Sequence, residues 1–148
     1  MVTVYDVEPL KLIKKLAFVL KQEGLEKPAW VGMVKSGSHV ERLPQDKDFW
    51  YIRCASILRN AYVNQVVGVG SLRVHYGKRK KRGVKPEKHR KAGGKIIRKA
   101  LQELEKLGYI QKSKTKAGRE LTPKGRKLLD KIAFEIYKEE KEGTKNEQ

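Results

Sequence analysis

Lysine and arginine side chains are concentrated in one stretch of this 148-residue chain, and their common chemistry is the binding of anions. Between Arg73 and Lys99 the sequence places thirteen Lys or Arg residues against one carboxylate, Glu87. Lysine and arginine are almost never fully buried unless they are paired, so this stretch cannot belong to a hydrophobic core. A solvated basic loop is one interpretation, but such a loop gains nothing from the exclusion of acids. We expect an exposed element that binds nucleic-acid phosphates through Lys78, Arg79, Lys80, Lys81, Arg82, Lys85, Arg90 and Lys91.

A second group of polar side chains has helical spacing in the segment 48–64. At 100° per residue the apolar members share one side, which must face the core: Trp50, Cys54, Ile57, Leu58 and Ala61. The opposite side contains no acid and mixes guanidinium, amide, hydroxyl and aromatic groups: Phe49, Arg53, Ser56, Arg59 and Asn60. Guanidinium groups that fork onto phosphates, next to a ring that stacks on bases, suit irregular RNA. An ordinary exposed helix face is the alternative interpretation.

A third candidate is the predicted helix start at Gly93, Gly94 and Lys95. The first backbone N–H groups of a helix lack intrahelical partners and can hold a phosphate. Lys95 and Arg98 are the side chains expected to assist there, with plain helix capping as the alternative.

Residues for catalysis or metal binding do not form a recognisable constellation. His39, His75 and His89 have no second ligand at a metal-binding spacing. Cys54 falls on the apolar side of its helix, where a core residue is expected rather than a nucleophile. We therefore expect no catalytic residue, no metal, no cofactor and no small-molecule substrate, and we expect that the protein is not an enzyme.

Charge and length set the class of protein. The chain carries 35 Lys and Arg against 17 Asp and Glu, a formal net charge of +18, while 39% of its residues are hydrophobic. This hydrophobic content is too high for a wholly disordered chain, and the length suits a single domain over residues 1–148. No apolar run approaches the ~18 residues of a membrane span, and no secretory signal pattern is visible. With one cysteine, the composition predicts a cytoplasmic protein without a membrane partner.

The elements that must position these residues follow from periodicity and from helix breakers. Helices are expected over about 8–23, from Pro28 to the loop at 36–38, over about 48–64 and 94–107, and from Pro123 onward. The stretch 66–91 loses the helical period and is expected to form a β-hairpin, extended from Val67 to Tyr76, with the run 78–83 at its tip. Short strands are expected at 109–112 and 119–121. The tail, about 138–148, is expected to be frayed and flexible.

The predicted fold class is mainly α. Helix, glycine, strand, turn, strand and helix follow one another from residue 94 onward, which is the layout of a winged-helix unit. We expect a winged-helix-like bundle of about five helices with a protruding basic β-hairpin and a small wing.

Three separated motifs, taken in order, go beyond composition. The segments Asp48–Arg59, Gly68–Gly77 and Gly118–Ala133 resemble small-subunit ribosomal protein nineteen of the archaeal and eukaryotic type, which is unrelated to the bacterial protein of the same number. Pro28–Trp30 and Ile97–Glu105 also resemble that family. The likeness covers residues 3 to about 137 in one register.

The resemblance implies a mainly helical, winged-helix-type fold that binds small-subunit rRNA in the head of the small ribosomal subunit. It also implies neighbouring ribosomal proteins and a role in rRNA maturation during assembly. The basic helix of the family maps to Arg53 and Arg59, and its cationic hairpin to the Lys78–Arg82 region. Family members often carry Trp at the first aromatic position, where this chain has Phe49 followed by Trp50, so either ring is a candidate for RNA stacking.

The sequence thus supports the hypothesis of a non-catalytic rRNA-binding protein of the small ribosomal subunit. The chief alternative is a winged-helix DNA-binding regulator that uses the helix at 94–107 for recognition. An enzyme acting on RNA is the third class.

Overall fold

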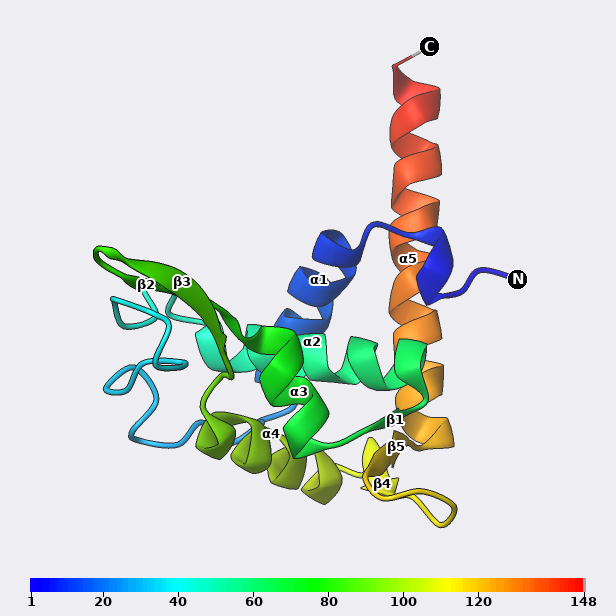
Figure 1. The fold of residues 1–148 in the computed structure, drawn as a ribbon. Coiled ribbons are helices and arrows are strands. Elements are labelled where there is room, and N and C mark those ends of the chain that lie inside the picture. The colour runs from blue at the N-terminus through cyan, green and yellow to red at the C-terminus, as the bar shows by residue number, and fades with distance from the viewer. Residues whose placement is uncertain (148) are drawn as a thin grey trace.

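The structure, a computed structural model, describes residues 1–147, so the last residue of the predicted tail lies outside the described residues. In this part of the chain five α-helices and two small antiparallel sheets follow a short 3-10 helix, η1 (Figure 1). The fold is mainly α, as predicted. The bounds are η1 Val4–Asp6, α1 Pro9–Gln22, α2 Phe49–Asn64, β1 Val66–Val67, α3 Val69–Tyr76, β2 Lys78–Arg82, β3 Lys85–Arg90, α4 Gly94–Lys106, β4 Ile110–Lys112, β5 Arg119–Leu121 and α5 Pro123–Asn146.

Helix α2 lies at the centre of the hydrophobic core and packs against α1, α4 and α5. The predicted core face of α2 is confirmed, because Trp50, Cys54, Ile57, Leu58 and Ala61 are fully buried. The Trp50 indole Nε1 donates a hydrogen bond to the Glu26 carbonyl at 3.0 Å, which satisfies its polar group inside the core. The predicted bounds of α1, α2 and α4 hold to within two residues.

Three short strands form one antiparallel sheet in the order β1-β5-β4. Val66 pairs with Glu120, and Ile110 pairs with Leu121. This sheet ties the end of α2 to the segment between α4 and α5. The predicted strands near 110 and 120 are therefore confirmed, while the pairing of β1 with β5 links positions that sequence reasoning did not connect.

The prediction of extended chain from Val67 to Tyr76 is wrong, because residues 69–76 form helix α3. The Ser71 hydroxyl accepts a hydrogen bond from the Gly68 N–H at 3.1 Å and donates one to the Gly68 carbonyl at 3.0 Å, which closes the helix start. Val69, Leu72 and Tyr76 lie on one side of α3 and pack against the core. Tertiary packing of this face outweighs the β propensity of valine and tyrosine.

The hairpin is correspondingly shorter than the predicted range of about 66–91. The basic run Lys78–Arg82 is strand β2 rather than the tip, and it pairs with β3, Lys85–Arg90. The turn consists of Gly83 and Val84. Gly83 has a φ of 67°, and Val84 is not in the left-handed region, which is the pattern of a two-residue type II′ turn. The hairpin projects from the body of the molecule (Figure 1), and all of β3 and most of β2 are exposed.

The predicted helix starting at Pro28 does not form. Residues 29–34 make turns, with the Val31 N–H donating to the Pro28 carbonyl and the Met33 N–H to the Trp30 carbonyl. Gly32 has a φ of 92°, which interrupts any helical continuation.

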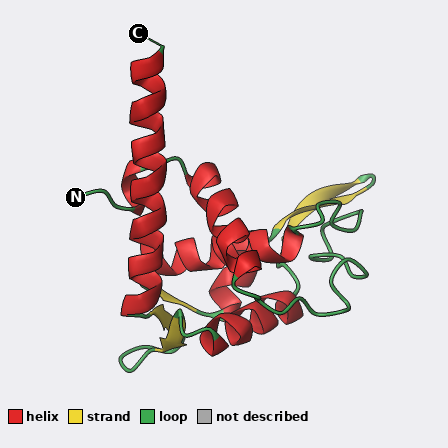
Figure 2. Cartoon of the chain, turned by 180° about the vertical axis from the view of Figure 1, so that it is seen from behind, coloured by secondary structure: helices red, strands yellow, loops and turns green. Residues whose placement is uncertain are grey.

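Helix α5 begins as predicted: the Thr122 hydroxyl accepts a hydrogen bond from the Gly125 N–H at 3.2 Å, and Pro123 occupies the first turn. The sequence predicts that the helix frays after Tyr137, whereas in the structure α5 continues to Asn146. Figures 1 and 2 show this last part projecting beyond the rest of the chain. Lys11 and Lys15 of α1 reach Glu140 and Glu139 at 2.9 and 2.7 Å, which supports the first turn of the extension. The flexibility of residues 138–148 remains a prediction.

Candidate nucleic-acid interface

Arg53 on α2 lies between two aromatic rings. Its guanidinium carbon is 4.0 Å from the centroid of Tyr76 and 5.3 Å from that of Phe49. No carboxylate lies within ion-pair distance in residues 1–147. Burial lowers the pKa of Arg53 from its ordinary value, but an arginine stays charged at physiological pH. The side chain is thus a desolvated cation held in a fixed orientation by two rings.

Tyr76, which the sequence analysis did not select, organises the predicted polar face of α2. Its hydroxyl is 2.7 Å from the Ser56 hydroxyl and accepts a hydrogen bond from the Asn60 amide at 3.0 Å. Asn60 is only 7% exposed, so its amide faces α3 rather than solvent. Direct RNA contact by Ser56 and Asn60 remains a prediction, and the geometry gives both residues a role in holding Tyr76 under Arg53. Recognition of the i, i+3, i+7 spacing of Val69, Leu72 and Tyr76 would have revealed this ring.

Arg59 lies nearly two turns further along α2 than Arg53 and is half-buried. Its Nε is buried and has no hydrogen-bond partner among the described residues. A buried, unpartnered guanidinium nitrogen is costly, because desolvation of a charged donor is not compensated. An anionic partner at Arg59 would remove that cost, and RNA binding by Arg59 remains a prediction.

The hairpin β2–β3 carries the densest positive charge. Its register places Lys78 opposite Arg90, Lys80 opposite Lys88 and Arg82 opposite Lys85. Like charges directly across two strands destabilise a sheet. Within residues 1–147, Arg79, opposite His89, makes the only ion pair of the hairpin, with Glu87 at a nitrogen-to-oxygen distance of 3.8 Å. An isolated two-stranded hairpin is only marginally stable in water. A bound polyanion would stabilise this hairpin, because it would neutralise the facing cations.

The base of the hairpin is tied to α3 and to the start of α4. Arg73 Nε donates to the Ala92 carbonyl at 2.8 Å, and the Ala92 N–H donates to the Arg73 carbonyl at 2.9 Å. The Gly93 N–H donates to the Ser36 carbonyl at 2.8 Å. These backbone contacts orient the exposed cations of β2 and β3 relative to α2.

The first turn of α4 extends the same cationic region. Lys95 Nζ lies 4.9 Å from the Trp30 ring centroid, and both Lys95 and Arg98 are exposed. A Cβ placed on Gly94 would be 3.1 Å from Arg98 Nη1 and 3.4 Å from Arg73 Cδ, so the two arginines converge above this glycine. Lys91 is also exposed.

The pKa of His39 shows the sign of the charge around the base of the hairpin. Burial lowers the pKa of His39 from its ordinary value, and the charges of Lys78, His89 and Arg53 lower it further. The effect indicates a net positive environment around the hairpin base. We call the whole region the basic surface; it comprises Arg53, Arg59, Arg73, the hairpin 78–90, Lys91, Lys95 and Arg98.

Other chemistry is not supported by the geometry of the described residues. In residues 1–147 no three His, Cys, Asp or Glu side chains gather to hold a metal ion, and no helix is both long and apolar enough to cross a membrane. Burial raises the pKa of the Cys54 thiol, so this side chain stays protonated inside the core.

Residues 3–139 of the chain match the family model for ribosomal protein S19e. The chain is 43% identical over 142 residues to small ribosomal subunit protein eS19 of Emericella nidulans, covering 95% of this chain and 96% of that protein. It is 41% identical to eS19A of Schizosaccharomyces pombe, covering 95% and 98%. It is 44% identical to eS19 of the archaeon Aeropyrum pernix, covering 94% and 92%.

Proposed function

This chain belongs to the ribosomal protein S19e family, and on that basis we propose that it is a structural constituent of the small ribosomal subunit that binds small-subunit rRNA. Its place is the subunit head, in the cytoplasm, among neighbouring ribosomal proteins. Its contribution to rRNA maturation is to hold an RNA fold during assembly, and it has no catalytic role.

The cross-strand pairing of cations in the hairpin carries this proposal. Lys78 opposite Arg90 and Lys80 opposite Lys88 are unfavourable pairs in the free protein. Of the thirteen cations between Arg73 and Lys99, only Arg79 and Lys99 lie within 4.0 Å of a carboxylate in the described chain. RNA phosphates between the strands would relieve that repulsion and release counterions.

The two parts of the basic surface have different tasks. Arg53 is fixed between Phe49 and Tyr76, so it presents a rigid cation to a preformed RNA shape. The hairpin and the start of α4 neutralise phosphates where RNA segments converge. Phosphate contacts of this kind position the protein, whereas rigid side chains against unpaired bases select the site.

The arrangement of elements supports a winged-helix-type unit. It runs α2, β1, α3, α4, β4, β5, with the sheet order β1-β5-β4 and a small wing between β4 and β5. The same arrangement favours the second candidate, a DNA-binding regulator with α4 as recognition helix. Glu103 of α4 does not present a free negative charge to DNA, because it is 4% exposed and paired with Lys99 and Lys106.

A competition experiment separates the two candidates. Gel shifts of the full chain with fragments of small-subunit rRNA, competed by duplex DNA at fixed salt, should show that structured RNA is displaced only by a large excess of DNA. The affinity should fall by roughly three to five decades between 50 and 200 mM salt if six to ten phosphates are neutralised. Equal competition by duplex DNA, or affinity that does not change with salt, would overturn the rRNA assignment.

A further inference from the structure

Helix α1 carries an exposed stripe that the basic surface does not use. Leu10, Lys14 and Phe18 recur every four residues on its solvent side, and Leu10 and Phe18 are 55% and 61% exposed. Lys14 and Phe18 line two grooves, one on each side of α1. We call these three residues the Phe18 ridge.

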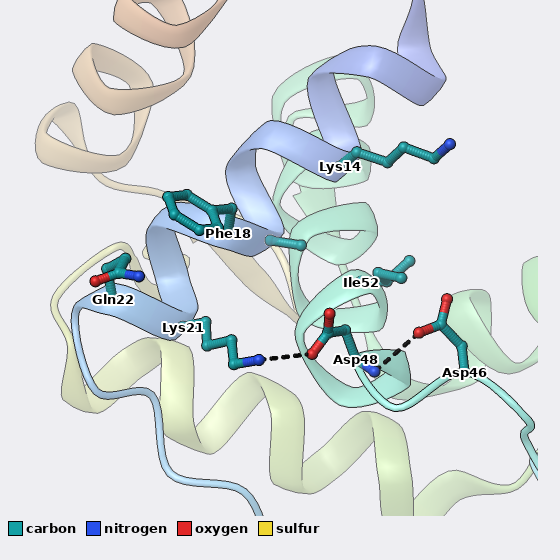
Figure 3. Close-up of a pocket in the computed structure, with 8 residues that line it drawn as sticks. Lys14, Phe18, Lys21, Gln22, Asp46, Asp48 and Ile52 are labelled. Carbon is teal, nitrogen blue, oxygen red and sulfur yellow. Dashed lines mark hydrogen bonds and ion pairs between the residues drawn. The ribbon is translucent and has the colours of Figure 1, made fainter.

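The first groove lies between α1 and the segment that leads into α2, with a volume of about 400 Å³. Figure 3 shows Phe18 and Lys14 on α1 facing outward, with Ile52 of α2 beside Asp46 and Asp48. The second groove lies between α1 and α5, with Ile136 in its wall and Glu139 and Glu140 at its edge. Exposed apolar side chains that gather beside a groove are typical of a protein interaction site.

Among the groove-lining residues of the described chain, only Lys14 and Asp46 lack an opposite charge within 4.0 Å. Lys11 and Lys15 pair with Glu140 and Glu139, and Lys21 pairs with Asp48 at 3.0 Å. Lys14, at the centre of the ridge, has no carboxylate within 4.0 Å in residues 1–147 and is exposed. A negative charge on a partner would therefore be favourable opposite Lys14, between the apolar side chains of Leu10 and Phe18, and unfavourable next to Asp46 at the edge of the first groove.

The same charges disfavour RNA as the occupant. Asp46 and Asp48 border one groove, and Glu139 and Glu140 border the other. A phosphate backbone laid along either groove would run beside these carboxylates, and like-charge contact costs affinity. Phe18 offers a ring, but no unpaired cation other than Lys14 accompanies it among the groove-lining residues.

We infer that the Phe18 ridge is the docking site for an acidic-apolar segment of a neighbouring protein in the small subunit. A carboxylate of that segment meets Lys14, and its apolar side chains cover Phe18 and Leu10. This inference rests on the proposed ribosomal function and deepens it: the chain binds RNA through the basic surface and protein through α1.

Substitution on the ridge tests the inference with matched controls. Phe18→Glu and Lys14→Glu should each lower the affinity for small subunits purified without this protein by about tenfold or more, as at other central interface residues. The controls are Phe134→Glu, another exposed phenylalanine (55%) outside both grooves, and Lys131→Glu, an exposed lysine of α5. They should change the affinity by less than about threefold. Equal losses in ridge and control variants would overturn the inference.

Binding of the free variants to an rRNA fragment separates this inference from the proposed function. Phe18→Glu should bind the fragment within about twofold of the unsubstituted chain, because Phe18 lies outside the basic surface. If the unsubstituted chain fails to bind rRNA, the proposed function fails. If it binds rRNA and the ridge variants enter subunits normally, only the docking site fails.

Photocrosslinking identifies the occupant. A benzoylphenylalanine at position 18, in intact small subunits, should crosslink to a peptide of another protein that carries Asp or Glu next to apolar residues. A crosslink to rRNA, a crosslink to a second copy of this chain, or no crosslink would each overturn the inference.

Discussion

In the hairpin β2–β3, cations lie opposite cations, and among the described residues Glu87 is the one carboxylate within 4.0 Å of a hairpin cation. At the contact between α1 and α5, by contrast, Lys11 and Lys15 each meet a glutamate at 2.9 Å or less. We call the latter contact, with Glu135, Glu139 and Glu140, the α1–α5 seam. Lysine serves binding in the first region and helix-to-helix packing in the second. The presence of nearby carboxylates, rather than the number of lysines, distinguishes the two.

The largest effect should come from removal of hairpin charge. Lys81→Gln, Lys85→Gln and Lys88→Gln together should weaken rRNA binding near 0.1 M salt by roughly two decades and make the log–log salt slope shallower by about 2 to 3. The triple variant should be at least as stable as the unsubstituted chain, because Lys88 no longer opposes Lys80. Filter binding at several salt concentrations and urea unfolding measure both quantities.

The matched control removes the same charge elsewhere. Lys131, Lys138 and Lys145 are exposed on α5. Their replacement by Gln should change rRNA affinity by less than about threefold. If the two triple variants lose rRNA affinity equally, net charge alone explains binding. The hairpin would then contribute no more to rRNA binding than the lysines of α5.

Tyr76→Phe tests whether the α2 face is held rigid. The substitution leaves the Asn60 amide and the Ser56 hydroxyl without their partner, so the free energy of unfolding should fall by about 1 to 3 kcal/mol. Urea unfolding gives the measurement. Tyr137→Phe is the control, because no hydrogen bond from its hydroxyl is present in the described chain, and it should cost less than about 0.5 kcal/mol. Unchanged stability in Tyr76→Phe would contradict the holding role.

Glu103 supplies a buried example of compensated charge. Burial alone would raise the pKa of Glu103, but hydrogen bonds from Lys99 and Lys106 outweigh burial and hold it below its ordinary value of 4.5. A carboxyl with a lowered folded pKa stabilises the fold above its unfolded pKa, and this stabilisation is lost as the pH falls through the folded value. Glu103→Gln should therefore cost about 1 kcal/mol at pH 7.

The difference between Glu103→Gln and the unsubstituted chain should shrink as the pH falls below 4.5, the ordinary pKa of this side chain. Thermal unfolding from pH 7 to pH 3 follows it. A difference that stays constant over that range would mean that Glu103 contributes through packing and not through its charge.

The smallest effect should appear at the α1–α5 seam. Lys15→Gln removes the contacts to Glu139 and Glu135, so amide hydrogen exchange in residues 138–146 should quicken by about two- to fivefold, the range of an exposed ion pair. Lys14→Gln, one residue earlier and without a carboxylate partner, should leave that exchange unchanged. If Lys15→Gln left the exchange rates of residues 138–146 unchanged, the ion pairs of Lys15 would not stabilise the end of α5.

The helices with regular apolar spacing were predictable, and the irregular segments were not. The stripe of α2 and the Thr122–Pro123 start of α5 are local signals that the structure confirms. Helix α3 was missed because Gly68 and Gly70 suggested a bend and Val69, Val74 and Tyr76 favour strands. Its helical state depends on the packing of Leu72 and Tyr76 against distant elements, which local propensity does not contain.

In the candidate site too, some residues could be selected from local sequence patterns, whereas others depend on tertiary contacts. Arg53, Arg59 and the hairpin cations were selected from the sequence, and their contact with RNA remains a prediction. Tyr76 was not selected, because its role requires that α3 bring its ring onto α2. The burial of Asn60 follows from the same contact.

The sequence by itself determined the excess of positive charge, its concentration between Arg73 and Lys99, and the mainly helical fold, because composition and 3.6-residue periodicity are local properties. Only the tertiary structure decided which cations lack partners. Lys11 and Glu140 are 129 residues apart, yet they meet at 2.9 Å, while Lys80 faces Lys88 through a strand register that shifts between Lys80 and Arg82. Electrostatic energy depends on distance in space, and only folding fixes that distance.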